Sequence, residues 1–183
     1  MKEVSRKRLG RQALERARRV RLMVFDVDGV LTDGTLLYGP AGEALKAFHA
    51  LDGHGLKMLA ASGVACALLS GRKSAAVTRR ATELGIEHVL QGIEDKLPVL
   101  QELLTKKNLR IENAGYMGDE LVDLPVLTRF GFACAPREAP EAVRSRVHYV
   151  PGAAAGRGAV REVCELVMRA QSTLESALRG YLG

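Results

Sequence analysis

The segment Leu22–Gly34 constrains the fold of this chain more than any other. Its first four residues, Leu22–Phe25, are apolar and predict a strand buried on both faces. The strand is followed at once by two acids, Asp26 and Asp28, and by Gly29, which permits a sharp turn. A buried strand gains nothing from carboxylates at its end. We therefore expect it to present them at the carboxyl edge of a sheet, where open α/β folds bind ligands.

The rest of the chain alternates short apolar segments with longer helical ones. This alternation predicts a parallel sheet with right-handed crossovers, so we expect an α/β fold, a Rossmann-like three-layer sandwich. A hairpin over residues 34–49, with a turn at Gly39–Gly42, interrupts the pattern. The expected strands of the sheet cover residues 22–25, 64–69, 88–90, 114–117, 131–135 and 147–150, and the expected helices cover 56–61, 74–84, 93–107, 121–130, 138–145 and 159–182.

Polar residues follow three further strands of the predicted sheet. Ser70 and Arg72 follow one strand, Asp119 and Asp123 another, and Lys96 begins the helix after a third. Because parallel strands end at one edge, we expect these groups to meet the two acids of the first strand there. The set is complete for phosphoryl transfer through a carboxylate. Only oxygen ligands are offered, which favours Mg²⁺, with Mn²⁺ or Co²⁺ as substitutes.

Each of these residues also has a simpler structural explanation. Ser70 could cap the next helix, and Lys96 could be a solvated helix lysine. Asp119 and Asp123 could favour a helix dipole. Their joint occurrence, in order, at successive strand ends makes coincidence improbable. A dinucleotide enzyme is disfavoured because no G-x-G-x-x-G follows the first strand.

Positive charge is concentrated at the N-terminus. The first 21 residues hold nine Lys and Arg and two Glu, a net charge of +7, whereas the remaining 18 basic and 19 acidic residues give −1. We therefore divide the chain into a basic helical leader, residues 1–21, and a single domain, residues 22–183. The leader could bind nucleic acid or an anionic surface, but it lacks aromatic residues. Its apolar residues are spaced like one face of a helix that packs on the domain. They are Leu9, Ala13, Ala17 and Val20.

Two other classes of location are disfavoured by the sequence. No apolar run approaches the roughly 20 residues that cross a bilayer, and no apolar region follows the basic N-terminus as in a signal peptide. Cys66, Cys134 and Cys164 lack the spacing of metal ligands, which indicates reduced core thiols. We expect a cytoplasmic protein without a membrane or nucleic-acid partner.

The segment Asp26-Val-Asp-Gly-Val-Leu-Thr-Asp33 resembles the signature D-x-D-G-x-x-T-D of the haloacid dehalogenase superfamily of phosphohydrolases. More narrowly, residues 14–171 resemble the capless phosphatases of 3-deoxy-D-manno-octulosonate 8-phosphate, which act in lipopolysaccharide precursor synthesis. The resemblance implies that the Asp26 strand lies in the centre of the sheet. It extends to Ser70-Gly-Arg-Lys73, to Gly118-Asp-Glu120 with Asp123, and to Gly156-Arg-Gly-Ala-Val-Arg-Glu162.

The resemblance also implies a role for each residue at the sheet edge. Asp26 would attack phosphorus and become an aspartyl phosphate, while Asp28 would protonate the leaving group and then activate water. The metal ligands would be Asp26, the main-chain carbonyl of Asp28, and Asp119, with Asp123 behind them. Ser70, Lys96 and Asp28 would contact the phosphoryl group.

Further residues match the substrate-binding positions of that family. They are His49, Asp52, Gly53, Lys57, Arg72 and Arg80. The three cations among them suit a sugar acid with a phosphate at one end and a carboxylate at the other. Leu51 stands where the family often has Arg, which removes a donor. The alternative substrate is therefore a nine-carbon, sialic-type sugar acid 9-phosphate.

The spacing of the motifs leaves no room for a cap domain. Only 44 residues separate Asp26 from Ser70, and 26 separate Ser70 from Lys96. The hairpin at 34–49 is apolar on both arms, and an isolated hairpin is marginal in water. Pairing with other copies would cover its edges, and the resembling family joins such hairpins in a tetramer. We therefore expect a homotetramer whose neighbours complete each site, the alternative being a hairpin folded on its own domain.

Overall fold

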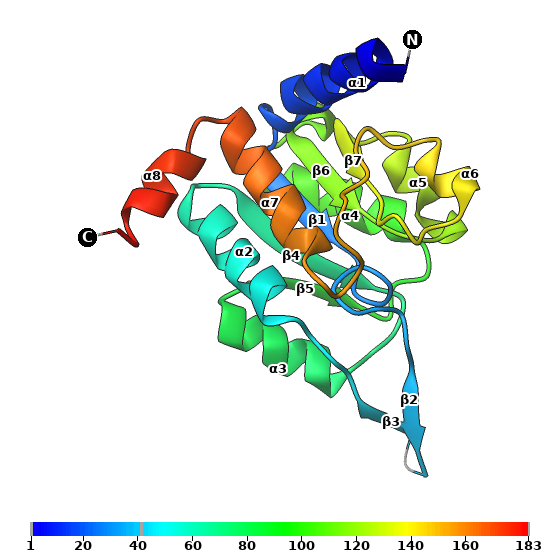
Figure 1. The fold of residues 1–183 in the computed structure, drawn as a ribbon. Helices are drawn as coiled ribbons and strands as arrows, with labels where there is room; N and C mark the ends of the chain where they lie inside the picture. Colours follow the sequence, from blue (N-terminus) through cyan, green and yellow to red (C-terminus); the bar gives the residue numbers. More distant parts are fainter. Residues whose placement is uncertain (1, 41, 183) are drawn as a thin grey trace.

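A computed structural model describes residues 2–40 and 42–182 of the chain. Five parallel strands form one sheet, and the expected central position of the Asp26 strand is confirmed (Figure 1). That strand pairs in register with a neighbour on each side, so all three end at the same edge. In order across the sheet, the strands are β5 (His88–Gln91), β4 (Ala65–Ser70), β1 (Leu22–Phe25), β6 (Ala114–Met117) and β7 (Phe132–Cys134).

Helices cover both faces of this sheet and make the expected three layers (Figure 1). Side chains of β1 alternate between the two faces: Met23 and Phe25 pack on one, Leu22 and Val24 on the other. Because both faces are covered, every position of β1 is apolar. The first face holds α1 (Lys2–Ala17), α2 (Ala50–Ala61), α3 (Ala75–Leu84), α7 (Ala159–Ala170) and α8 (Leu174–Arg179), and the second holds α4 (Lys96–Lys106), α5 (Leu124–Leu127) and α6 (Glu141–Arg144).

A small antiparallel hairpin, β2 (Leu37–Gly39) and β3 (Gly42–Leu45), projects from the molecule (Figure 1). Its arms are shorter than the predicted hairpin over residues 34–49. Leu37, Tyr38 and Leu45 are 45%, 63% and 69% exposed. Within the described residues, only this hairpin and α2 lie between β1 and β4, so that stretch holds no cap domain.

The predicted start of α2 at residue 56 is wrong by six residues. The helix begins at Ala50, and Gly53 and Gly55 lie inside it. Glycine disfavours a helix interior, but here close packing requires it. A Cβ on Gly53 would lie 2.1 Å from the guanidinium of Arg80, and a Cβ on Gly55 would lie 2.9 Å from Cα of Arg161. Tertiary contacts therefore override local propensity.

Several other predicted boundaries are also corrected. The helix predicted over 159–182 is broken after α7 by Ser172, which has a φ of 60°. The strand predicted over 147–150 is a single bridge between Tyr149 and Cys134. The remaining helices are shorter than predicted because loops take their first turns: α4 begins at Lys96 instead of residue 93, a 3₁₀ turn (Leu121–Asp123) precedes α5, and α6 covers only Glu141–Arg144.

The described side chains of the leader pack on the domain. Ala13, Ala17 and Val20 are buried in the core beside α7, as the helical spacing predicted. Arg16 donates a hydrogen bond to the carbonyl of Gly131 at 3.0 Å. The side chain of Leu9 lies outside the described residues. In the part of the chain that the structure describes, no helix combines the length and apolar character needed to cross a membrane.

Candidate active site

The carboxyl edge of the sheet brings the predicted polar residues together. A cavity of about 520 Å³ opens at this edge. Asp26 and Asp28 follow β1, Ser70 ends β4 and Asp119 follows β6, because these strands run parallel and in register. The first residue of α4, Lys96, completes the lining. Residues from four separate segments thus face one space.

Lys96 forms the centre of a buried network beneath the cavity. Its Nζ donates to Asp26 Oδ2 at 2.5 Å, to Asp123 Oδ1 at 2.7 Å and to the Tyr116 hydroxyl at 3.2 Å. Tyr116 donates to the same Asp123 oxygen at 2.6 Å. All four side chains are buried, so each hydrogen bond restricts its partners strongly. The network fixes the ammonium group beside Asp26.

The cluster has more carboxylates than cations, and this shifts their pKa values. Burial, followed by the charges of Asp26 and Asp123, raises the pKa of Asp119 to about 7. Burial also raises the pKa of Asp26 to about 6, although Lys96 opposes the change. Burial disfavours the charge of Lys96, but the neighbouring carboxylates outweigh it and hold its pKa above the usual value. A divalent cation would offset this excess of negative charge.

The carboxylates present fit a hard metal ion. One ligand oxygen from each of Asp26, Asp119 and Asp123 lies within 4.8 Å of the others. Both oxygens of Asp123 are already occupied: Oδ1 accepts from Lys96 and Tyr116, and Oδ2 accepts from the main-chain N–H groups of Asp119 and Glu120 at 3.0 and 3.1 Å. Each oxygen of Asp123 thus accepts two hydrogen bonds, whereas each oxygen of Asp26 accepts one. The carboxylates with lone pairs left for a metal are therefore those of Asp26 and Asp119.

Gly29 leaves room for the Asp119 carboxylate beside the first catalytic turn. Its φ of +77° places it in the left-handed region, which glycine tolerates best. A Cβ at this position would lie 2.0 Å from Asp119 Oδ2. Glycine is therefore required both for the turn and for the approach of the acid.

Metal binding is expected to stabilise the protein more as the pH rises. Asp119 has a pKa of about 7 in the folded state and 3.8 in the unfolded chain. Between these pH values only the unfolded state releases the proton. The metal-free protein therefore loses stability as the pH rises from 3.8 to about 7. Metal requires the ionised form, so it must displace this proton below pH 7. For each proton displaced, metal binding weakens by about 1.4 kcal/mol for every unit that the pH falls below this pKa.

Differential scanning calorimetry with and without Mg²⁺, from about pH 5.5 to about pH 8, checks this expectation. The increase in Tm caused by Mg²⁺ should grow with pH, and Asp119→Asn should remove most of it. An equal Mg²⁺-induced increase at both ends of the range would contradict the assignment.

Asp28 makes contacts that the sequence did not predict. Lys46, from the segment after β3, donates to the carboxylate of Asp28 and lies 3.2 Å from Glu43. Arg72 Nε lies 3.8 Å from the other oxygen of Asp28, and its Nη1 donates to the hydroxyl of Tyr38 at 3.1 Å. The hairpin therefore reaches the edge of the active site through its charged and phenolic side chains.

Ser70 is buried in the cavity wall. Its Oγ accepts the N–H of Arg72 at 3.1 Å, which leaves the hydroxyl hydrogen available for a ligand. The alternative role as a helix cap falls to another residue, because Ser74 accepts the N–H of Val77 at the start of α3.

The remaining residues expected to bind substrate do not line this cavity in the single chain. His49 caps α2 through Nδ1, which accepts the N–H of Leu51 at 3.3 Å. Gly53 packs against Arg80, which pairs with Glu83 at 3.4 Å. Asp52 is buried and binds main-chain groups of α7. Lys57 is exposed on α2.

Sequence reasoning missed two contributors, Tyr116 and Lys46. Tyr116 stands within an apolar strand, where an aromatic residue is ordinary; only its position two residues before Gly118 and three before Asp119 could have indicated that its hydroxyl lies near the acids. Lys46 follows the hairpin strand β3, and the sequence alone could not show that this segment returns to Asp28. In both cases the missing information was three-dimensional.

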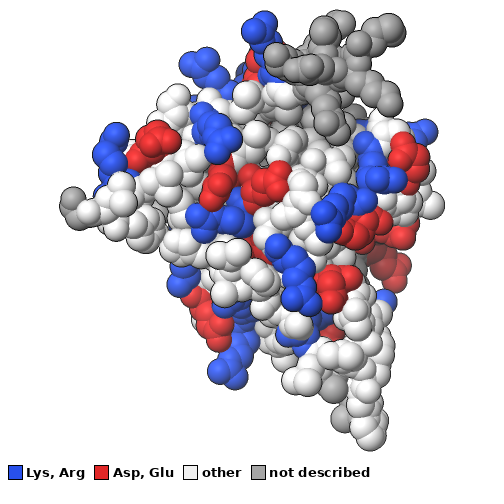
Figure 2. Space-filling view, viewed as in Figure 1, with Lys and Arg blue, Asp and Glu red and all other residues white. Residues whose placement is uncertain are grey.

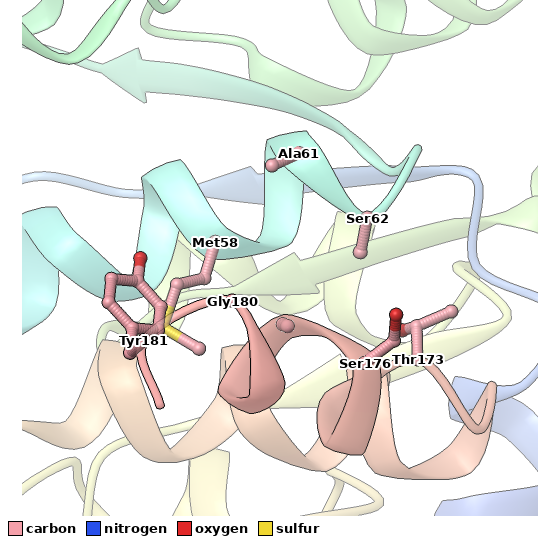
Figure 3. A pocket seen from close by; sticks show the side chains of 8 residues that line it. Met58, Ala61, Ser62, Thr173, Ser176, Gly180 and Tyr181 are labelled. Atoms are coloured by element: carbon pink, nitrogen blue, oxygen red, sulfur yellow. The ribbon is translucent and has the colours of Figure 1, made fainter. Parts of the chain in front are cut away.

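A second cavity, of about 600 Å³, lies between α2 and the C-terminal segment (Figure 3). Met58 and Tyr181 lie near one end of it, and Ser176 and Thr173 lie near the other. No residue of its lining carries a charge or an acid–base group of the kind found at the sheet edge. The groups capable of acid–base chemistry or metal binding therefore gather at the first cavity.

Comparison with known proteins relates this architecture to characterised phosphatases. No family model matches the chain. The 3-deoxy-D-manno-octulosonate 8-phosphate phosphatase KdsC of Yersinia pestis is 42% identical over 164 residues, covering 90% of this chain and 88% of that protein. The structure of the corresponding phosphatase from Moraxella catarrhalis, in complex with a magnesium ion, a phosphate ion and KDO, is 39% identical with a TM-score of 0.90, covering 92% of this chain and 97% of that one.

A third similar protein was solved with another metal. The cobalt-bound deoxy-D-mannose-octulosonate 8-phosphate phosphatase YrbI of Haemophilus influenzae is 36% identical with a TM-score of 0.87, covering 92% of this chain and 99% of that one. The parallel sheet with two acids after its central strand defines the haloacid dehalogenase-like class of phosphatases. Within this class, the chain belongs to the KdsC family of 3-deoxy-D-manno-octulosonate 8-phosphate phosphatases.

Proposed function

We propose that this protein is a divalent-metal-dependent phosphatase that converts 3-deoxy-D-manno-octulosonate 8-phosphate into 3-deoxy-D-manno-octulosonate and phosphate, a step in lipopolysaccharide precursor synthesis. The observation that carries the proposal is the position of Asp26, held by Lys96 and facing the Asp119 carboxylate across one cavity. Membership of the KdsC family supports the choice of substrate.

Asp26 acts as the nucleophile. One oxygen accepts the N–H of Val27 at 2.6 Å and the other accepts from Lys96, so the carboxylate has a fixed orientation. It attacks phosphorus in line, the sugar oxygen leaves with a proton from Asp28, and an aspartyl phosphate remains. Asp28 then takes a proton from water, which attacks phosphorus and restores Asp26. Ser70 donates a hydrogen bond to the phosphoryl oxygens, and Lys96 supplies positive charge throughout.

The metal is Mg²⁺ in this proposal, with Mn²⁺ or Co²⁺ as substitutes. Asp26, Asp119 and the main-chain carbonyl of Asp28 would hold it, while Asp123 accepts hydrogen bonds from the main chain of Asp119 and from Lys96 and so orients both. A bound divalent ion supplies charge neutralisation between the carboxylate nucleophile and the phosphoryl oxygens. The magnesium and cobalt ions in the related structures support the use of a divalent metal.

Release of phosphate from a panel of sugar phosphates tests the proposed substrate. The panel contains the eight-carbon 8-phosphate, the nine-carbon sialic-type 9-phosphate and simple hexose phosphates, each assayed with Mg²⁺ and with chelator. We expect the highest kcat/KM for the eight-carbon acid and no turnover with chelator. A higher value for the nine-carbon acid would transfer the proposal to that substrate, and Leu51 would then explain the change.

We also propose that the active unit is a homotetramer built through the hairpin. The projecting hairpin carries few charges and is drawn almost wholly in white in Figure 2. Leu37, Tyr38 and Leu45 are exposed there, and an exposed strand edge favours pairing. His49, Gly53, Lys57 and Arg80 do not line the cavity of their own chain, which supports a role for a neighbouring subunit in bringing them to the substrate.

Replacing both Leu37 and Tyr38 with Glu is expected to dissociate the tetramer, because burying unpaired charge costs several kcal/mol. Hydrolysis of the sugar acid phosphate should fall sharply, whereas hydrolysis of 4-nitrophenyl phosphate should fall less because it requires only the Asp26 centre. Sedimentation with both assays checks this, with Leu178→Glu on α8 as a control. A fully active monomer with unchanged substrate preference would refute the role of the hairpin.

The leader has no part in the proposed reaction, and the enzyme is cytoplasmic in this account. On the face seen in Figure 2, the described Lys and Arg side chains alternate with Asp and Glu, so residues outside the leader form no broad basic surface there. Deleting residues 1–12 leaves the buried Ala13 and Ala17 in place. This truncation should keep phosphatase activity within a few-fold and remove most of any salt-dependent binding to DNA or anionic vesicles. Binding that survives the deletion unchanged would show that the leader is not its source.

A further inference from the structure

Asp52 is the most deeply buried acid outside the catalytic cluster. Only 1% of it is exposed. Its Oδ2 accepts the N–H of Gly158 at 3.0 Å, and its Oδ1 accepts the N–H of Arg161 at 2.9 Å. These N–H groups belong to the start of α7 and have no partner within that helix. Both oxygens of Asp52 are therefore used, and a carboxylate from α2 caps a different helix.

The two helices touch closely at this point, which fixes the position of the cap. A Cβ on Gly55 would lie 2.9 Å from Cα of Arg161. The backbones of α2 and α7 thus approach each other directly. Asp52 cannot reach a substrate in the active-site cavity without giving up both hydrogen bonds to α7.

The loop before α7, residues 152–158, connects this cap to the catalytic turn. At one end of the loop, Glu162 accepts the N–H groups of Gly152 and Ala153 at 3.0 Å each. In its middle, Gly156 donates its N–H to the carbonyl of Val30 at 3.1 Å. A Cβ on Gly156 would lie 2.6 Å from the carbonyl carbon of Thr32. The loop therefore lies in van der Waals contact with the main chain of the turn.

That turn carries the reacting groups. Thr32 is 2% exposed, and its Oγ1 accepts the N–H of Gly34 at 3.2 Å and that of Gly29 at 3.4 Å. Gly29 lies against the Asp119 carboxylate and directly follows Asp28. A shift of the loop would therefore move Thr32, and with it the acid–base residue and the metal-binding edge.

We propose that Asp52 is a positioning residue for catalysis. It anchors the loop of residues 152–158 where the loop enters α7, and this loop holds the turn of residues 28–34 in its reactive geometry. Asp52 acts through α7 and the loop and does not contact the substrate. The proposal rests on the proposed phosphatase function, and it gives Asp52 a different task from the substrate-binding role that family resemblance implies.

Asp52→Asn tests the proposal because the amide keeps the shape of the side chain but turns an NH₂ group toward one of the two donors. Glu165→Gln is the matched control: Glu165 accepts from Arg161 Nε at 2.6 Å on the same helix but makes no contact with the loop N–H groups. Steady-state kinetics with saturating Mg²⁺ are measured on the octulosonate phosphate and on 4-nitrophenyl phosphate. The assay temperature is one at which calorimetry shows each variant to be folded.

We expect Asp52→Asn to lower kcat about ten- to hundredfold on both substrates by the same factor, with the ratio of their KM values unchanged, since a displacement of about 1 Å can cost that much. Glu165→Gln should keep the wild-type kcat. A higher KM for the sugar acid phosphate with unchanged turnover of the aryl phosphate would overturn the proposal in favour of substrate contact. A lower Tm with full kcat on both substrates would reduce Asp52 to a purely structural role and also overturn it.

Gly156→Ala provides a second variant if Asp52→Asn is not folded at any usable assay temperature. The added methyl group pushes on Thr32 from the middle of the loop and leaves the Asp52 side chain that caps α7 unchanged. For this variant too, kcat is expected to fall by the same factor on both substrates. Unchanged kcat on both substrates would overturn the proposal. If the wild-type enzyme fails on the octulosonate phosphate but hydrolyses the aryl phosphate, the proposed substrate fails alone, and the aryl phosphate still reports on Asp52.

Discussion

Asp26→Asn is expected to abolish phosphate release on every substrate, by more than about 10⁴-fold, as the loss of a nucleophile does in other enzymes. An amide is a poor nucleophile toward phosphorus. Asp123 also lies beside Lys96 and Asp119, but it is fully buried and does not line the cavity, so it cannot replace Asp26. The variant should remain folded, because Asp123 still pairs with Lys96 and the replacement has nearly the same volume.

Asp28→Asn gives a graded comparison for the same reaction. Its main-chain carbonyl is unchanged, so metal binding should persist, but most activity should be lost because an amide cannot transfer the proton. Stopped assays of phosphate release measure the loss of activity, and calorimetry with Mg²⁺ titration measures the metal binding that should remain. Near-normal turnover by Asp26→Asn would contradict the covalent mechanism, whatever the activity of Asp28→Asn.

Lys96→Met is expected to cause the second large effect, on stability as well as rate. Lys96 is 4% exposed and pairs with Asp26 at 2.5 Å and Asp123 at 2.7 Å. Removing it leaves two buried carboxylates without a cation, which typically costs about 3–5 kcal/mol. The loss should shrink as the pH falls, because burial already favours the protonated form of Asp26, whose pKa is about 6. Turnover should become hard to detect.

Urea denaturation of metal-free protein at about pH 8, above the pKa of about 6 of Asp26, measures this change. Lys106→Met is the matched control, because Lys106 lies on the same helix and pairs with Glu102 at the exposed surface. An exposed pair contributes at most about 1 kcal/mol, so this variant should unfold near the wild-type urea midpoint. Equal midpoints for the two Lys→Met variants would contradict the central place given to Lys96.

The fold could be predicted from the sequence where local pattern and tertiary structure agree. β1 is apolar at every position and buried on both faces, and its acids mark the strand end. The pattern failed where a contact from elsewhere in the chain decides the conformation. Gly53 and Gly55 argued against an early start of α2, but the helix needs them because Arg80 and Arg161 pack against their backbone.

The site divides in the same way. Asp26, Asp28, Ser70, Lys96 and Asp119 could be predicted to meet, because parallel topology alone brings strand ends together. Tyr116 and Lys46 could not, since the first lies in an apolar strand and the second depends on how the hairpin folds back.

Trapping the phosphorylated enzyme tests the central claim most directly. Wild-type protein is mixed with Mg²⁺ and the octulosonate phosphate, quenched in acid within milliseconds, digested and analysed by mass spectrometry. The account predicts one added phosphoryl group on Asp26, removed by longer incubation before the quench and absent from Asp26→Asn. Steady turnover with no phosphorylated Asp26 at any quench time would contradict it.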